Sequence, residues 1–268
     1  PCSLELGGKD PAIVLPDADL DLSAKMVLTG ALENAGQACV STERVYVDQA
    51  VYEPFLQKLI ENANTLTFCG GDGLEVHFGS LTNEREVLRV EAHIADAVAK
   101  GAKVVFGGKR RPDLGPLFFE PTILTGVDHT MDVMREETFG PIVPIMKVTG
   151  ESEAIRLAND NRYGLSAAVF SKNYAHAEKI ARQIVAGDVA INHPALTFGS
   201  PGAPMGGAAG RESGLGRRNG VEGLMRFVIP QAITFDTGWI ITPGLSHTPP
   251  RAVFLARLMH WIRRAIPV

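Results

Sequence analysis

The chain has 268 residues, of which 45% are hydrophobic and 21% charged, and its net charge is −4. This is enough apolar material for a substantial core, arranged as one large domain or two small ones. The composition argues against a nucleic-acid-binding protein, because there is no basic excess with interleaved aromatic residues, and no apolar run is long enough to cross a bilayer.

The cysteines indicate a reducing environment. There are three of them, Cys2, Cys39 and Cys69, without C-x-x-C spacing, which argues against a disulfide framework and against a zinc site. We therefore expect a cytoplasmic protein without a metal. Because the first residue is Pro1 and not methionine, we also expect this chain to be a fragment of a larger protein.

The first half of the chain alternates helical and strand-like segments. Residues 20–35 predict a helix that runs into a small, flexible Asn-Ala-Gly-Gln turn just before Cys39, and "ERVYVD" (43–48) predicts a strand. Residues 50–66 predict a second helix, because their apolar side chains recur at helical spacing. These side chains are Val51, Phe55, Leu59, Ile60 and Ala63.

A third helix has recognisable ends. Asn83 is placed as its N-cap, with Glu86 three residues later, and Gly101 is placed to end it. The following "KVVFGG" (103–108) predicts a strand.

The alternation continues to about residue 192. Strands are predicted at 140–148, 165–171 and 188–192, and helices at 151–161 and 175–187. Strands that alternate with helices indicate an α/β domain with a largely parallel sheet and flanking helices.

The amino-acid composition changes after about residue 197. The segment 198–220 is rich in Gly and Pro and is predicted to be loop. Next, "LMRFVIPQAITF" (224–235) is strand-like, and Pro230 makes it an edge strand, which either pairs with another subunit or completes its own sheet. Residues 249–267 predict an amphipathic helix that docks on the protein body or lies on a membrane surface.

Cys39 is the first candidate for chemistry. The turn before it can expose the sulfur and direct backbone N–H groups toward an oxyanion, although a lone cysteine is often a small buried hydrophobe. Cys2 and Cys69 have no such setting, and we expect both to be structural. Glu5 precedes Gly7 and has two interpretations: a general base, or an ordinary glutamate at the end of a strand.

The hexapeptide "EETFGP" is the second candidate. Its Glu137 and Phe139 are suited to bind a ribose hydroxyl pair and a flat ring. The alternative is that Glu136 and Glu137 are simply a solvated pair of acids before a strand. The glycines of "SGLGRRNG" lie at 214, 216 and 220. They do not have the spacing of a dinucleotide-binding motif, so we do not expect a phosphate-binding site there.

Five motifs, in order, resemble the aldehyde dehydrogenase superfamily. They are "LELGGKDPAIVLPDADLD", "NAGQACVSTERVYV", "EETFGPIVPIMKV", "YGLSAAVFS", and "PMGG" with "SGLGRRNGVEGL", and together they extend from about residue 3 to 235. The resemblance implies the catalytic α/β portion of such an enzyme, with a strand near 225–235 that forms a homodimer or homotetramer.

The resemblance also implies a mechanism. Cys39 would attack an aldehyde to give a thiohemiacetal, and hydride transfer to NAD or NADP would leave a thioester. Glu5 would activate the hydrolytic water. Glu137 and Phe139 would hold the nicotinamide ribose, and Gly7 would let the backbone approach the cofactor.

The resemblance further implies domain boundaries. Residues 1–8 would end the cofactor-binding domain, 9–206 form the catalytic domain, 207–236 the Gly-rich loop and oligomerisation strand, and 237–268 the tail. A Rossmann-like half would be missing. Two alternatives to the enzyme are a non-catalytic remnant that acts only in assembly and a cofactor-free esterase.

The motifs lean slightly toward succinate-semialdehyde dehydrogenases. Many of those carry an arginine six residues before the cysteine, where this chain has Glu33. A carboxylated substrate would be repelled there.

Overall fold

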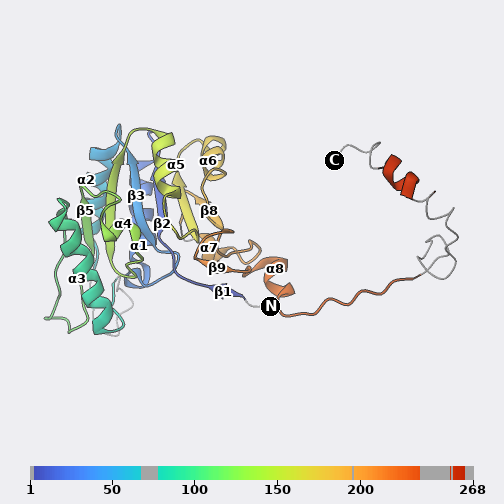
Figure 1. Cartoon of the computed structure of the whole chain (residues 1–268). Coiled ribbons are helices and arrows are strands. Elements are labelled where there is room, and N and C mark those ends of the chain that lie inside the picture. Colours follow the sequence, from blue (N-terminus) through green and yellow to red (C-terminus); the bar gives the residue numbers. More distant parts are fainter. Residues whose placement is uncertain (1–2, 68–77, 195, 236–253, 255, 263–268) are drawn as a thin grey trace. The chain divides into compact units, whose positions relative to one another are not determined.

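The computed structural model describes residues 3–67, 78–194, 196–235, 254 and 256–262, which leaves Cys2 and Cys69 outside the described residues. The chain divides into two units, Pro1–Val228 and Ile229–Val268. Most elements of the first unit are labelled in Figure 1. In chain order they are β1 (Leu4–Glu5), β2 (Asp10–Val14), α1 (Leu20–Leu32), the 3₁₀ helix η1 (Glu33–Gly36), β3 (Thr42–Asp48), α2 (Tyr52–Ala63), α3 (Glu84–Ala99), β4 (Lys103–Phe106), β5 (Thr122–Thr125), α4 (Asp132–Arg135), β6 (Ile142–Val148), α5 (Glu151–Asn159), β7 (Ser166–Phe170), α6 (Tyr174–Ala181), β8 (Asp188–Ile191), α7 (Leu196–Gly199), β9 (Gly214–Leu215) and α8 (Gly220–Met225).

A seven-stranded sheet forms the centre of the first unit. Its order is β4-β5-β6-β3-β2-β7-β8, and every neighbouring pair is parallel except β4 and β5. The strands β2, β3 and β7 are buried along their whole length, as expected for parallel strands with helices on both faces. The predicted α/β fold with a largely parallel sheet is confirmed.

The strand order explains how both faces become covered. The crossover from β2 to β3 and the crossover from β6 to β7 run toward opposite edges of the sheet. Right-handed crossovers therefore place α1 and α5 on opposite faces. Helix α2 packs beside α1 and buries Phe55, Leu59 and Ala63, so the predicted apolar face of this helix is confirmed.

Both predicted ends of α3 are confirmed. The Asn83 side chain accepts a hydrogen bond from the Glu86 N–H at 3.2 Å, which satisfies one of the free donors of the first turn. Gly101 follows the last residues of the helix with φ of +104°, a left-handed value that glycine adopts without strain.

Several predicted boundaries are wrong. The helix predicted over 175–187 ends at Ala181. The helix predicted over 20–35 ends at Leu32, because the next residues turn into left-handed conformations. In the strand predicted over 224–235, the first two residues belong to α8, and the described residues 226–235 contain no strand. Strand propensity forms a ladder only with a partner, and these residues lie exposed, Ile229 by 94% and Phe235 by 81%. Completion of the chain's own sheet is therefore wrong for these residues, whereas pairing with a second subunit stays a prediction.

The second unit contains the predicted tail helix in part. Residues 254 and 256–262 are helical, with Phe254, Leu258, Trp261 and Ile262 at helical spacing on one face. The other residues assigned to this helix, 249–253, 255 and 263–267, lie outside the described residues. Among the helices that the structure describes, none is long and apolar enough to cross a membrane.

Candidate active site

The quoted motifs meet at one edge of the sheet. Gly7 and Gly8 precede β2, Cys39 precedes β3, and Glu137 precedes β6, while these three strands are neighbours that run in parallel. Parallel neighbours begin at the same edge, so the segments before them converge. Ligand sites of open α/β sheets usually lie at the carboxyl ends of the strands, whereas this cluster lies at the amino ends.

Gly8 brings the first two motifs into contact. A Cβ on Gly8 would lie 2.1 Å from the carbonyl oxygen of Cys39, a distance that no side chain tolerates. The backbone of the Glu5 motif therefore packs directly on the backbone of the cysteine.

The turn before Cys39 has a left-handed backbone that hydrogen bonds support. Asn34, Ala35 and Gly36 all have positive φ, of 52°, 58° and 74°. For a residue with a Cβ such as Ala35, this conformation costs about 1–2 kcal/mol. Gln37 compensates by hydrogen bonding in two directions: its Nε2 donates to the Asn34 carbonyl at 3.0 Å, and its Oε1 accepts from the Thr82 N–H at 2.8 Å.

Cys39 is half-buried on a small apolar cluster formed by Val40, Leu165 and Met205. Burial, then the nearby Glu5 carboxylate, raises the pKa of the Cys39 thiol, while Arg218 and the cysteine's own backbone N–H oppose the rise. The free thiol is therefore mostly protonated at neutral pH.

Glu5 lies on β1, which pairs in antiparallel fashion with β9 of the Gly-rich loop. Its Oε2 forms an ion pair with Nη1 of Arg218 at 2.9 Å, with the side chains 27% and 42% exposed. Arg218 was not among the site residues expected from the sequence. The only signal in the sequence is the pair of arginines in "SGLGRRNG", and the sequence does not say which carboxylate they meet.

Glu137 and Phe139 lie beside Gly7 and Gly8. Glu137 Oε1 accepts the Gly8 N–H at 2.8 Å, and a Cβ on Gly7 would lie only 2.3 Å from Oε2 of the same carboxylate. Burial raises the pKa of Glu137, and the Gly8 N–H opposes the rise. Phe139 has φ of 52°, a value that costs about 1–2 kcal/mol for a residue with a side chain.

A surface cavity of about 320 Å³ adjoins these side chains. Its lining residues are Thr82, Asn83, Arg85, Glu86, Arg89, Glu137 and Phe139. A carboxylate has about four acceptor positions, and the Gly8 N–H occupies one of those on Glu137. Acceptor positions beside an aromatic ring fit the hydroxyl pair of a ribose and a flat ring.

A second polar cluster lies on β3 and α5. The fully buried Arg44 donates to the carbonyls of Leu157 and Ala158 at 3.2 Å and 3.0 Å, in the last turn of α5. Helix C-terminal carbonyls attract a cation, so these oxygens balance the guanidinium. Arg44 Nε also donates to the Lys9 carbonyl at 2.7 Å, which fixes the start of β2.

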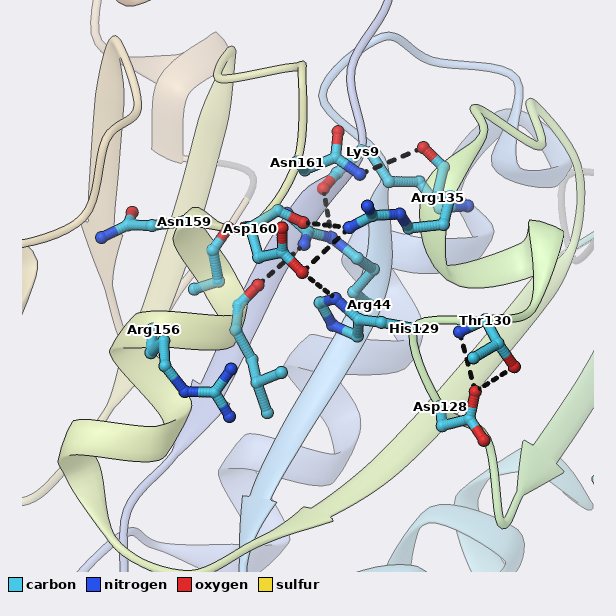
Figure 2. Close-up of polar contacts among 12 residues, drawn as sticks. Lys9, Arg44, Asp128, His129, Thr130, Arg135, Arg156, Asn159, Asp160 and Asn161 are labelled. Atoms are coloured by element: carbon cyan, nitrogen blue, oxygen red, sulfur yellow. Dashed lines mark hydrogen bonds and ion pairs between the residues drawn. The ribbon is translucent and has the colours of Figure 1, made fainter.

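Figure 2 shows His129, Arg135 and Asp160 close to Arg44. His129 Nε2 lies 2.8 Å from the Tyr46 hydroxyl and its Nδ1 lies 2.9 Å from Asp160 Oδ2. Tyr46 is fully buried, so a substrate cannot reach its hydroxyl. This cluster joins the last turn of α5 to β3 and to the start of β2. No group of residues with the composition of a metal site occurs in the part of the chain that the structure describes.

The sequence profile of the aldehyde dehydrogenase family matches residues 1–233. The chain belongs to this family. It is 44% identical over 245 residues to a putative succinate-semialdehyde dehydrogenase [NADP(+)] of Mycolicibacterium smegmatis, which covers 91% of this chain and 47% of that protein.

Solved aldehyde dehydrogenases share the fold. The succinate-semialdehyde dehydrogenase of Burkholderia pseudomallei is 42% identical, with a TM-score of 0.80 over 84% of this chain and 46% of that one. A point mutant of betaine aldehyde dehydrogenase from Staphylococcus aureus, in complex with NAD⁺ and with a BME-modified cysteine, is 36% identical with a TM-score of 0.80 over 89% of this chain and 49% of its own. The chain thus spans about half the length of the relatives that it matches.

Proposed function

We propose that this chain is the catalytic portion of an aldehyde dehydrogenase that oxidises an aldehyde to a carboxylic acid with NAD or NADP. The observation that carries the proposal is the convergence of Cys39, the Glu5 motif and Glu137 at the amino ends of β2, β3 and β6. The names of the relatives, which include both NADP(+) and NAD⁺ as cofactors, support the same reaction.

Cys39 Sγ is the proposed nucleophile. The thiolate attacks the aldehyde carbon, a C–S bond forms, and the carbonyl electron pair moves to oxygen. The nicotinamide cofactor supplies the hydride acceptor, so the aldehyde carbon is oxidised and a thioester remains on Cys39. Because the free thiol is mostly protonated, its proton passes to solvent before the thiolate attacks.

Glu5 is the proposed base for hydrolysis. It takes a proton from water, the resulting hydroxide attacks the thioester carbonyl, and the C–S bond breaks to release the acid and the thiolate. Arg218 holds one oxygen of the Glu5 carboxylate, which keeps this base in a defined direction. Glu137 and Phe139 are the proposed holders of the nicotinamide ribose, and Gly7 is the position where the backbone must stay bare beside them.

The test is steady-state formation of reduced cofactor by the longer protein of which we propose this chain to be a part, named below the full-length protein. We expect turnover of a short aldehyde in the wild type, and a loss of at least about a thousandfold in Cys39→Ala, since the nucleophile is removed. Full turnover in Cys39→Ala, or no turnover of any short aldehyde by the wild type, contradicts the proposal.

Glu33 bears on the substrate. It lies at the start of the turn that leads to Cys39 and, with Lys25, lines a cavity of about 420 Å³. We expect a neutral short aldehyde to have a higher kcat/KM than succinate semialdehyde, and Glu33→Arg to reverse part of this preference. If the wild type instead prefers the carboxylated aldehyde and Glu33→Arg changes nothing, Glu33 plays no part in selection.

A cofactor-free esterase is the second candidate, because this chain itself contains Cys39 and Glu5, the two groups that such a reaction needs. Turnover of an activated ester that disappears in Cys39→Ser supports this activity. A homo-oligomer is also proposed, since residues 226–235 expose apolar side chains, and light scattering of the purified protein tests it.

A further inference from the structure

Glu43 connects three segments of the candidate site. It lies on β3, four residues after Cys39, and is only 2% exposed. Its Oε2 accepts the Thr138 N–H at 2.7 Å and the ammonium of Lys9 at 2.5 Å, and its Oε1 accepts the Phe139 N–H at 2.9 Å. Both carboxylate oxygens therefore hold the segments that precede β2 and β6.

These bonds select a particular backbone form. Phe139 is left-handed, and strained conformations of this kind persist only where the surroundings fix them. The two consecutive N–H groups of Thr138 and Phe139 both point at one buried carboxylate, which is a strong charge-assisted arrangement. Glu43 thereby fixes the short segment that carries Glu137 on one side and the Phe139 ring on the other.

Lys9 completes the arrangement. It is 1% exposed, and its ammonium donates to Glu43 and also to Thr138 Oγ1 at 3.0 Å. Thr138 Oγ1 lies 3.0 Å from Nδ1 of His93, a histidine whose pKa is lowered to about 4, chiefly by burial and then by the charge of Lys9. His93 is therefore neutral near pH 7, and the Thr138 hydroxyl accepts from Lys9 and makes its second hydrogen bond with His93 Nδ1.

We propose that Lys9 and Glu43 are positioning residues for the cofactor end of the site. They touch neither aldehyde nor sulfur; they act through the backbone of Thr138 and Phe139 on the groups that face the nicotinamide ribose. This inference rests on the proposed function. The cysteine end has supports that involve neither Lys9 nor Glu43, namely the apolar cluster and Gln37.

The test compares the cofactor end of the site with the cysteine end, because the proposed residues act only on the first. In Glu43→Gln the amide oxygen can accept only one of the two N–H groups, because the amide nitrogen is a donor that faces the other one. In Lys9→Met the chain length stays similar and the charge is lost, while Arg44 still holds the backbone carbonyl of Lys9. The double variant Lys9→Met/Glu43→Gln removes both charges and covers the case in which a single variant leaves an unpaired buried charge and does not fold.

Three measurements on the full-length protein decide the outcome. They are the Kd of NAD⁺ and NADP⁺ by calorimetry, the rate of Cys39 alkylation by iodoacetamide, and the pKa of His93 by NMR. We expect Glu43→Gln to weaken cofactor binding at least tenfold with an alkylation rate within twofold of the wild type, and Lys9→Met to raise the pKa of His93. Glu91→Gln, which removes one partner of an ion pair with Arg110 at 2.6 Å on the surface of α3, is the control and leaves all three unchanged.

Each remaining outcome counts against the inference. Cofactor affinity within twofold of the wild type in a folded Glu43→Gln or double variant overturns it. A parallel loss of cofactor affinity and of alkylation shows a general structural role and overturns it as well. If the wild type binds neither cofactor, the proposed function itself fails, and that result is distinct from a wild type that binds while the variants bind equally well.

Discussion

Gly7→Ala is the perturbation that tests the cofactor side of the site most simply. The added Cβ would lie 2.3 Å from Oε2 and 2.6 Å from Cδ of Glu137. The carboxylate must retreat by about 1 Å to reach ordinary van der Waals separation. Because it ends a flexible side chain, it can move without unfolding the protein.

This movement of the Glu137 carboxylate breaks a hydrogen bond in the site. The bond from the Gly8 N–H to Glu137 Oε1, 2.8 Å long, stretches beyond hydrogen-bonding distance. A hydrogen bond to a charged group contributes about 1.5–3 kcal/mol. Since about 1.4 kcal/mol corresponds to a tenfold change in Kd, we expect NAD⁺ or NADP⁺ to bind about 10–100-fold more weakly.

Calorimetry on the full-length Gly7→Ala variant measures this change, with Cys39 alkylation as the control for an intact fold. Gly8→Ala is the matched contrast, because its Cβ would meet the backbone oxygen of Cys39 at 2.1 Å, which cannot move aside. We expect Gly8→Ala to disturb the cysteine as well as the cofactor. If Gly7→Ala binds cofactor within twofold of the wild type, the placement of Glu137 against the cofactor is wrong.

Two further predictions follow from the ionisable groups. Because the Glu5 charge raises the pKa of Cys39 and Arg218 lowers it, the pH profile of Cys39 alkylation should move to lower pH in Glu5→Gln and to higher pH in Arg218→Gln; shifts in the same direction for both variants would contradict this electrostatic account. His93 has its pKa lowered from 6.5 to about 4, so the unfolded chain binds a proton that the folded chain does not, and the free energy of unfolding should fall by about 3 kcal/mol as pH drops from about 6.5 to about 4. Urea unfolding across this pH range should show that the free energy of unfolding falls less with pH in His93→Gln than in the wild type. If it falls equally in both proteins, His93 is not held neutral.

Much of the fold follows from local signals in the sequence. The alternation of strands and helices predicts the parallel sheet, and the Asn83 cap and Gly101 mark the ends of α3, because these patterns depend on neighbours within a few residues. The exposed strand-like run 226–235 shows the limit of such signals. Its apolar character predicts a strand, but a ladder needs a second strand whose position the local sequence does not specify.

The site shows the same division. Cys39, Glu5, Gly7, Glu137 and Phe139 stand out in the sequence through their motifs, and the fold brings their segments to one edge of the sheet.

The ion pair between Glu5 and Arg218 joins residues more than two hundred positions apart. The buried pair of Lys9 and Glu43 depends on the register of neighbouring strands. Neither pairing has a local signature, so both required the structure.

The most direct test of the account is to find the acyl group itself. The full-length protein is mixed with a short aldehyde and NAD⁺, quenched within one turnover, digested and examined by peptide mass spectrometry. The account predicts an acyl mass on the peptide that contains Cys39, present at higher occupancy in Glu5→Gln because hydrolysis is slowed. Reduced cofactor that forms at the normal rate while this peptide stays unmodified in both proteins would contradict it.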